Sequence, residues 1–465
     1  MTTEAPAGAR LALPEGAGRF YRHGWHSWSV TGWVDRYATL RRTPVPEYRV
    51  MGDDPGFPEA ERLGGSGLGG YEGADGDTLV LGSLGLDGRV SVEDGELVGR
   101  GPAAWRPYRG SRTRAFGGYA ADLGEVLGAR PADPGPVWCS WYSYGTGITS
   151  ALMGEVIDGL GDLPFTVIQI DDGWQVAIGD WAPGPSFPEG MQAAAERIRR
   201  TGRRAGLWLA PFLADARSDL AGRHPEMLLR DSGGSPVEAA FNWGGPAYAL
   251  DVTCHDTLEQ VGSGIRLALS WGFDYLKLDF LYAAALPGVR PDGIGREAAY
   301  RMGIEAIRRA AGDECLLLAC GAPIVASLGV FDAIRIGPDT APYWENADRV
   351  RYLGDRAGPG LADAIATSVN RLWLRELIGL DPDVAFFRSR HCLLTSEQRR
   401  LGADLARICG FRATSDPPGW LDPDERRELE DFLAGRPVVE QVAAYRFVVD
   451  GRDVDLTEIV GGRPW

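Results

Sequence analysis

Short apolar segments alternate with amphipathic segments through the middle of the chain. The apolar segments are Val137–Trp141, Thr166–Ile170, Ala205–Leu209, Tyr275–Phe280, Cys315–Cys320, Ala333–Ile336, Leu372–Leu374 and roughly Cys409–Ala413. Helical periodicity lies between several of them, in Met191–Thr201, Thr257–Trp271, Glu297–Ala311 and Ser396–Ile408. This alternation predicts a (β/α)8 TIM barrel over residues 133–417, with a doubly wound open sheet as the alternative. The seventh and eighth strands have the weakest pattern.

The segments on either side of the predicted barrel have a different texture. Residues 1–130 show short β runs such as Thr78–Gly82 and Gly88–Val92, and no long helical period before Glu125, which predicts a β-rich, sandwich-like domain. The Pro-rich segment Arg130–Pro136 separates it from the barrel. Residues 418–465 predict a helix over Asp422–Leu433 followed by a small β appendage that includes Tyr445–Val449.

Composition restricts the class of protein. With 44% hydrophobic and 24% charged residues, the chain of 465 residues reads as globular, and a net charge of −16 argues against a nucleic-acid partner. No run of 18 apolar residues predicts a membrane span, and Met1–Arg10 does not resemble a signal peptide. The six cysteines form no CxxC pair, so we expect reduced thiols and a cytoplasmic protein. A homo-oligomer is compatible with this composition.

Aspartates follow several of the predicted strands. Asp171 and Asp172 follow the second, Asp279 ends the fourth and Asp339 follows the sixth. Because catalytic groups of a TIM barrel lie at the carboxyl ends of its strands, we expect these carboxylates to share one site. Paired carboxylates with few histidines indicate glycoside hydrolysis. No GxSxG or HExxH motif occurs, and we expect no metal or cofactor.

Lys277 is the only lysine among 48 basic residues, and it lies two positions before Asp279. Period-two alternation places both side chains on one face of the strand, where the ammonium favours an ionised Asp279. The alternative is a buried structural ion pair. Asp171 and Asp172 are two acceptors on one loop, which we expect to bind two neighbouring sugar hydroxyls, with helix N-capping by one of them as the alternative. Several of the 15 tryptophans stand beside Gly, Asp or His, which is typical of sugar-stacking rings as well as of ordinary core residues.

The order of several motifs resembles a known family. The matching segments are Gly24–Ser29, Trp138–Tyr142, Ile170–Trp174, Gly179–Trp181, Phe187–Met191, Gly206–Pro211, Leu250–Thr253, Tyr275–Phe280 and Arg335–Asp339. Taken together, these segments resemble the retaining α-galactosidases of clan D, and glycoside hydrolase family 36 (melibiase-like) more than family 27.

The resemblance implies a role for each matching residue. It implies that Asp279 is the nucleophile and Asp339 the acid/base, with their carboxyl groups roughly 5–5.5 Å apart as in retaining enzymes. It also implies a set of positions that contact the sugar. These are Asp171 and Asp172 for the hydroxyls at C4 and C6, Trp208, Lys277, Cys320 and Arg335 for other contacts, Trp25 and Trp28 from an N-terminal motif, and Trp141 at the floor. The implied substrate is a small oligosaccharide or glycoside with a terminal α-galactosyl residue.

The chain departs from the family pattern near the nucleophile. It reads Lys277-Leu278-Asp279-Phe280 where the common galactosidase form reads Lys-Trp-Asp-Met, and its N-terminal domain is short. The same chemistry on an α-glucoside or an α-N-acetylgalactosaminide therefore stays open, as does transglycosylation. A non-catalytic sugar-binding protein is the remote alternative.

Overall fold

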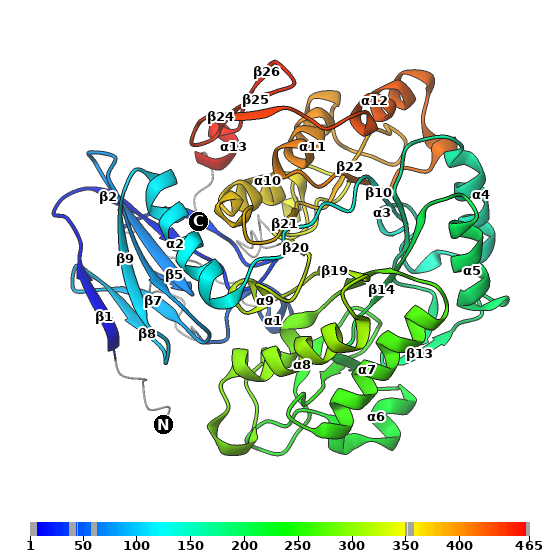
Figure 1. Ribbon diagram of the computed structural model, residues 1–465, viewed down its shortest axis with the longest axis horizontal. Helices are drawn as coiled ribbons and strands as arrows, with labels where there is room; N and C mark the ends of the chain where they lie inside the picture. The colour runs from blue at the N-terminus through cyan, green and yellow to red at the C-terminus, as the bar shows by residue number, and fades with distance from the viewer. Residues whose placement is uncertain are drawn as a thin grey trace.

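The computed structural model describes residues 7–36, 43, 45–56, 63–348, 351 and 358–461. Figure 1 shows N-terminal β-sheets on one side of a barrel and a small three-stranded sheet, β24–β26, beside the barrel helices. The first six residues of the chain and its last four lie outside this description, so the expectation for the very N-terminus is only partly covered. None of the helices within the described part is both long and apolar enough to cross a membrane.

The central sheet is parallel and closes on itself. Its strands pair in the order β21-β20-β19-β18-β14-β11-β10-β23-β22. Their bounds are β10 Val137–Cys139, β11 Val167–Ile170, β14 Arg204–Leu209, β18 Tyr275–Leu278, β19 Leu316–Ala319, β20 Ala333–Arg335, β21 Gly379–Asp381, β22 Val384–Ala385 and β23 Ala413–Thr414. The two end strands, β21 and β22, are separated only by Pro382 and Asp383, so one passage of the chain forms both edges and closes the ring. The predicted (β/α)8 barrel is confirmed, and the open-sheet alternative is wrong.

The last two barrel strands differ from their predicted positions. Leu372–Leu374 is a 3-10 turn, not the seventh strand, and the seventh strand is formed by β21 and β22. A short apolar run does not by itself distinguish a strand from a buried turn, because Leu372 and Leu374 are buried in either case. Cys409 ends a helix, which Gly410 terminates in the left-handed conformation, so the eighth strand starts only at Ala413.

The barrel contains the four helices predicted from the periodicity of the sequence, to within a few residues, and further helices that were not predicted. Their bounds are α4 Ser150–Leu160, α5 Gly190–Arg199, α7 His255–Ser270, α8 Arg296–Ala311, α9 Ile324–Ser327, α10 Leu361–Val369 and α11 Ser396–Cys409, and α12 Pro423–Leu433 follows the barrel. Helix α11 starts with a capping box between Thr395 and Gln398, which satisfies two of the backbone N–H groups at its start.

Loops at the carboxyl end of the barrel carry additional short elements. They are α3 Trp141–Tyr144, the hairpin β12 Gln175–Ala177 and β13 Asp180–Pro183, α6 Asp219–Arg223, and the sheet of β15 Leu213–Asp215, β17 Ala247–Ala249 and β16 Glu238–Ala240. The segment that joins β16 to β17 reaches the barrel mouth. The long insertion after β14 therefore supplies part of the wall above the barrel.

The N-terminal region contains two antiparallel sheets. One has the order β1-β8-β7-β4 and the other β3-β2-β5-β6-β9. The bounds are β1 Ala7–Ala12, β2 Gly18–Arg22, β3 Gly32–Asp35, β4 Gly64–Ser66, β5 Leu68–Gly73, β6 Thr78–Ser83, β7 Arg89–Glu93, β8 Glu96–Arg100 and β9 Trp105–Gly110. Phe20, Tyr71, Leu79, Val90 and Leu97 belong to one buried cluster formed by residues of both sheets. The β-rich, sandwich-like region is thus confirmed.

The same region contains two helices, α1 Pro46–Gly52 and α2 Arg112–Leu127. The expectation of no helix before Glu125 is therefore wrong. Three glycines in α2 lower its helical propensity and hide it in the sequence, but Ser111 caps its first turn. Tyr119 and Leu123 on its buried face help to pack it between the β-sheets and the barrel.

The C-terminal appendage is the antiparallel sheet of β24 Val439–Ala443, β25 Arg446–Val449 and β26 Arg452–Asp455, followed by α13 Thr457–Gly461. The Tyr445 hydroxyl donates to the Asn370 side chain at 2.9 Å, which ties the appendage to the barrel. The divisions between residues 130 and 133 and between 417 and 418 remain our proposal. The start of β10 at Val137 and of α12 at Pro423 supports them.

A buried arginine joins the barrel to the N-terminal motif around Trp28. Arg371 is fully buried, and its two terminal nitrogens donate to five backbone carbonyls. The acceptors are Gly24, His26, Ser27, Ser29 and Ile336, at 2.6 to 3.1 Å. Four of these carbonyls belong to the segment that carries Trp28. The guanidinium therefore fixes that segment against the barrel.

Replacing Arg371 by methionine should lower the free energy of unfolding by roughly 3 kcal/mol or more, because several buried carbonyls lose their donor. Denaturant titration followed by circular dichroism measures this. The matched control is Arg375→Met, since exposed Arg375 makes one long bond, 3.5 Å, to the Ile408 carbonyl. A loss for Arg371→Met no larger than for the control would contradict the assignment.

Candidate active site

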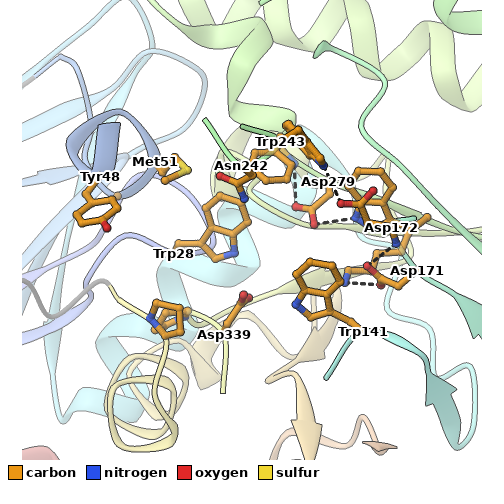
Figure 2. Close-up of a pocket in the computed structure, with 16 residues that line it drawn as sticks. Trp28, Tyr48, Met51, Trp141, Asp171, Asp172, Asn242, Trp243, Asp279 and Asp339 are labelled. Atoms are coloured by element: carbon orange, nitrogen blue, oxygen red, sulfur yellow. Dashed lines mark hydrogen bonds and ion pairs between the residues drawn. The ribbon is translucent and has the colours of Figure 1, made fainter. Parts of the chain in front are cut away.

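A cavity of about 270 Å³ opens at the carboxyl ends of the barrel strands. Its volume lies near the lower end of the range for small-molecule sites, roughly 300–1,000 Å³. The lining residues are Trp28, Tyr48, Met51, Gly52, Trp141, Asp171, Asp172, Trp208, Asn242, Trp243, Lys277, Asp279, Phe280, Pro338, Asp339 and Pro359. Figure 2 shows acidic and aromatic side chains gathered around this space, with Tyr48 and Met51 on the far side of Trp28 from Asp279.

Asp279 directly follows β18, and both of its carboxylate oxygens accept a hydrogen bond. The Trp208 indole nitrogen donates to Oδ2 at 3.0 Å, and the Phe280 backbone N–H donates to Oδ1 at 2.8 Å. Phe280 adopts the left-handed conformation with φ of 52°, which an aromatic residue rarely does. The turn after β18 and the indole together hold the Asp279 carboxylate in one orientation at the cavity.

Asp339 lies after β20, and its Oδ1 accepts a hydrogen bond from Arg335 at 3.1 Å. Burial raises the pKa of Asp339; Arg335 and Lys277 oppose this rise, and the charges of Asp279 and Asp171 add to it. The side chain keeps 34% of its surface exposed, so water in the cavity moderates the effect of burial. The negative charges of Asp279 and Asp171 raise the pKa of Asp339 in the same direction as burial does. Asp339 is thus suited to carry a proton at this cavity.

Arg335 is almost fully buried and divides its donors among three carboxylates. It donates from Nη1 to Asp339, from Nε to Asp381 at 3.2 Å and from Nη2 to Asp383 at 2.8 Å. The latter two aspartates lie in and next to the seventh strand. The guanidinium therefore connects the sixth strand to the seventh and fixes the side of Asp339 that faces away from the cavity.

Lys277 forms a buried ion pair with Asp171, Nζ to Oδ2 at 2.9 Å. Burial alone would lower the pKa of Lys277, but the acidic groups around it, Asp171 foremost, together outweigh burial and hold that pKa well above its usual value. The sequence left two alternatives for Lys277, a buried ion pair and a place at the site. The structure shows both, since Lys277 is paired and also lines the cavity. The partner is Asp171, however, and Asp279 is held by Trp208 and Phe280. The other oxygen of Asp171 accepts from the Asp172 backbone N–H at 2.9 Å.

Asp172 is held by side chains from two loops. Gln175 donates to its Oδ1 at 2.6 Å, and the Trp243 indole nitrogen donates to its Oδ2 at 2.8 Å. Burial raises the pKa of Asp172, and these two donors oppose the rise. Neither Asp171 nor Asp172 caps a helix, because the chain continues from them into β12. Both carboxylates are therefore positioned at the cavity, and the capping alternative is wrong.

Aromatic rings form much of the cavity wall. Phe280 packs edge-on against Trp28 with ring centroids 5.3 Å apart, and its ring lies at the same separation from Trp243. The Trp28 indole nitrogen is buried and has no hydrogen-bond partner among the described residues. Trp141 lies on the opposite side of the cavity from Trp243 in Figure 2. The wall combines apolar ring faces with polar groups, as sugar sites do.

The structure brings together most of the residues that the sequence analysis proposed. The residues that line the cavity are Asp171, Asp172, Asp279, Asp339, Lys277, Trp208, Trp28 and Trp141. The cavity does not include Trp25, Cys320 or Arg335 among its lining residues. The Trp25 indole nitrogen donates to Glu297 at 3.0 Å, Cys320 is buried, and Arg335 directs its donors to three aspartates. The predicted sugar contacts of these three residues therefore stay predictions.

Several residues of the site are absent from the sequence analysis. Tyr48, Met51 and Gly52 come from α1, and Asn242 and Trp243 come from the loop between β16 and β17. Neither segment carries a pattern that places it over a barrel strand. Asp381 and Asp383 were missed because the seventh strand was assigned to Leu372–Leu374. The run Gly379–Ala385, with two aspartates inside an apolar segment, carries the signal that could have found them.

Within the described residues, no group of three or more His, Cys, Asp or Glu side chains has an arrangement that would hold a metal ion. The closely spaced aspartates instead make hydrogen bonds and ion pairs with protein donors, as the contacts of Asp171, Asp172 and Asp279 show.

Solved structures resemble this chain over nearly its whole length. TtGalA, an α-galactosidase from Thermus thermophilus in complex with p-nitrophenyl α-D-galactopyranoside, is 47% identical, with a TM-score of 0.91 over 98% of this chain and 95% of that one. The same protein in complex with stachyose gives 48% identity and a TM-score of 0.86 over 93% and 95%. The GH36 α-galactosidase AgaA from Geobacillus stearothermophilus shares the fold at 13% identity, with a TM-score of 0.61 over 92% of this chain and 61% of that one.

Curated relatives match shorter segments. An A type blood α-D-galactosamine galactosaminidase of Flavonifractor plautii is 30% identical over 217 residues, 43% of this chain and 20% of its own length. Alpha-galactosidase 1 of Pediococcus pentosaceus is 25% identical over 166 residues, 32% of this chain and 22% of its own. The matched segments thus span about a fifth of these relatives. No family model matches the chain.

The closed barrel and the carboxylates at its carboxyl end define the class of the glycoside hydrolases. Within that class, the near full-length likeness to TtGalA at 47% identity shows the family. The chain belongs to the GH36-like α-galactosidase family.

Replacing Lys277 by methionine should lower the free energy of unfolding by roughly 3–5 kcal/mol, because Asp171 is left buried without its cation. Denaturant titration measures this. The double variant with Asp171→Leu should recover part of the loss, since it removes the stranded charge. Purely additive losses would show that the two groups do not interact as the 2.9 Å contact indicates.

Proposed function

We propose that this protein hydrolyses terminal α-galactosyl residues from oligosaccharides by a retaining double displacement. The observation that carries the proposal is the difference between two carboxyl groups that line one cavity. Asp279 is fixed by two N–H donors, whereas burial and neighbouring carboxylates raise the pKa of Asp339. A pair of carboxyl groups in unlike environments supplies a nucleophile and an acid.

In the first step Asp279 attacks the anomeric carbon. The carboxylate forms an ester bond to that carbon while the glycosidic bond breaks, and Asp339 gives its proton to the departing oxygen. Trp208 and the Phe280 N–H keep Asp279 oriented for attack. Arg335 holds Asp339 on the other side of the cavity. The products of this step are a galactosyl-enzyme and the free alcohol.

In the second step water replaces the enzyme ester. Asp339, now ionised, takes a proton from water, and the resulting oxygen nucleophile attacks the anomeric carbon and releases Asp279. The proton taken from water leaves Asp339 protonated, and Asp279 departs as a carboxylate, so the cycle is complete. Two inversions at one carbon retain its configuration. If a sugar hydroxyl takes the place of water, the same site performs transglycosylation.

The cavity walls support recognition of one terminal sugar. Asp171 and Asp172 offer carboxylate oxygens for hydroxyl groups, and the aromatic rings of the wall, among them Trp28, offer apolar surface. The leaving group lies, in this proposal, toward Tyr48 and Met51 of α1, which line the side of the cavity beyond Trp28. Stachyose and a nitrophenyl galactoside, the ligands named for TtGalA, suit such a site.

A galactosaminide is the second candidate for the substrate. It is favoured by the match to the galactosaminidase of Flavonifractor plautii, at 30% identity. The mechanism is unchanged, since the substituent at C2 does not take part in either displacement. The two sugars share the orientation of the hydroxyl at C4, so the carboxylate pair Asp171 and Asp172 does not separate them.

We also place the protein in the cytoplasm. All six of its cysteines are free, and three of them, Cys139, Cys315 and Cys320, are buried in the barrel core. Free buried thiols suit a reducing compartment.

Variants of the two carboxylates should fail in different steps. Asp279→Asn should lose activity on nitrophenyl α-galactoside by roughly 10⁴-fold or more, because no ester forms. Asp339→Ala should still release a burst of nitrophenolate, since this leaving group departs without a proton, and then turn over slowly. Stopped-flow absorbance follows both phases.

The same assay compares nitrophenyl α-galactoside with the α-glucoside and the α-N-acetylgalactosaminide. The wild type should prefer the galactoside. Asp313→Asn is the control, since Asp313 is an exposed aspartate outside the cavity that pairs only with Arg130 in the described contacts. Activity of the wild type on the glucoside alone would reject the proposed sugar. Unchanged turnover in Asp279→Asn would reject the mechanism.

A further inference from the structure

The seventh barrel strand is interrupted at Pro382 and Asp383, between β21 and β22. Asp383 is buried in the barrel, and its φ of 83° lies in the left-handed region. A non-glycine residue there is strained, and such strain persists where surrounding contacts hold it. The Asp383 N–H donates to Asp381 Oδ1 at 2.8 Å, which closes the tight turn. The interruption therefore aims one carboxylate at a defined place.

That place is the turn that carries Asp339. Asp383 Oδ1 accepts a hydrogen bond from Arg335 at 2.8 Å, and Oδ2 accepts one from the Thr340 backbone N–H at 2.9 Å. Thr340 directly follows Asp339. Arg335 precedes Asp339 by four residues and donates a hydrogen bond to it. The Tyr142 hydroxyl also donates to Oδ2. One carboxylate thus holds both flanks of the turn.

Charge around Asp339 is also unevenly distributed. Arg335 is shared by three carboxylates, so only a part of its charge acts on Asp339. The other charged groups that face this turn are Lys277 and Asp279 from β18 and the turn after it, and Asp171 after β11. The Tyr142 phenol faces it from α3. Lys277 is paired with Asp171, and its charge also lowers the pKa of Asp383, but this effect is smaller than those of Asp339 and Asp381, which raise it.

We propose that Asp383 is a positioning residue for Asp339, which fixes the turn that carries it and withholds part of the Arg335 charge from it. The inference rests on the proposed function of Asp339 as acid/base. Burial raises the pKa of Asp383, and the charge of Asp339 raises it further. Since repulsion between two carboxylates is mutual, Asp383 makes Asp339 hold its proton to higher pH. The two groups titrate as a linked pair.

The effect on catalysis has a definite sign. Glycosylation needs a protonated Asp339, so kcat/KM falls as pH rises through the pKa of this group. Asp383→Asn removes one negative charge and leaves more of the Arg335 charge to Asp339. The alkaline limb of the profile should therefore move to lower pH, by about one unit.

The choice of substrate separates this role from a merely structural one. Stachyose has a poor leaving group that needs the proton of Asp339, whereas nitrophenolate departs without it. At a pH just above the wild-type alkaline limb, Asp383→Asn should lose ~tenfold more activity on stachyose than on nitrophenyl α-galactoside. A loss of correctly folded enzyme would reduce both activities by the same factor.

The experiment measures kcat/KM against pH for both substrates, with the wild type, Asp383→Asn and the control Asp404→Asn. Asp404 is also a buried aspartate with an arginine partner, Arg452 at 2.5 Å, but it lies in α11 outside the cavity. The alkaline limb of kcat/KM for Asp404→Asn should lie at the same pH as that of the wild type. If Asp383→Asn does not fold, Asp381→Asn is measured instead. The amide oxygen of the new Asn side chain can still accept the hydrogen bond from the Asp383 N–H. Asp381→Asn should move the limb in the same direction.

An alkaline limb that stays in place, or equal losses on both substrates, would overturn the proposal for Asp383. A wild type that hydrolyses neither substrate would instead reject the proposed function. The two failures are therefore distinguishable.

Discussion

The site depends on the confinement of many carboxylates at one end of a barrel. Six of them meet there within the described part of the chain, and they share two cations: Asp171, Asp172, Asp279, Asp339, Asp381 and Asp383 with Lys277 and Arg335. Such a cluster is stable only if each charge has a partner or a proton. Lys277 neutralises Asp171, neutral N–H donors hold Asp172 and Asp279, and Arg335 is shared by the others. The unequal sharing of these partners creates unlike carboxyl groups, and unlike groups are what a double displacement requires.

The N-terminal region is part of the same arrangement. It supplies Trp28 and the helix α1 to the cavity wall, and these elements are useful only if they are held over the barrel mouth. Arg371 provides this hold for the segment that carries Trp28 through backbone carbonyls, so no further carboxylate has to enter a region that is already rich in them. The position of the ring of Trp28 therefore depends on a residue of the barrel that touches no sugar.

The sequence predicts the barrel and most of the cavity because local patterns specify both. Apolar strands that end in aspartate place Asp171, Asp172, Asp279 and Asp339 at one end, and the structure puts all four around one cavity. The seventh strand was misplaced because Pro382 and the strained Asp383 break its apolar pattern, and its two aspartates were lost with it.

Other failures have a different physical cause. Trp243 in a loop and Tyr48 in the short helix α1 reach the cavity through tertiary folding, and neither segment has a regular period, so their position is not encoded locally. Trp25 lies three residues from Trp28 in the same motif, but its indole is directed to Glu297 of α8. Residues of one motif can thus face opposite sides of an interface, and spacing alone does not separate them.

The central claim is that Asp279 forms a covalent bond to the sugar. It is tested most directly by peptide mass mapping after reaction with a galactoside that has a fluorine at C2 and an activated leaving group, which slows hydrolysis of the ester. The account predicts one galactosyl label, located on Asp279 in the peptide that contains Tyr275–Phe280. A label on another residue, or an enzyme that turns over this substrate without any labelled species, would contradict it.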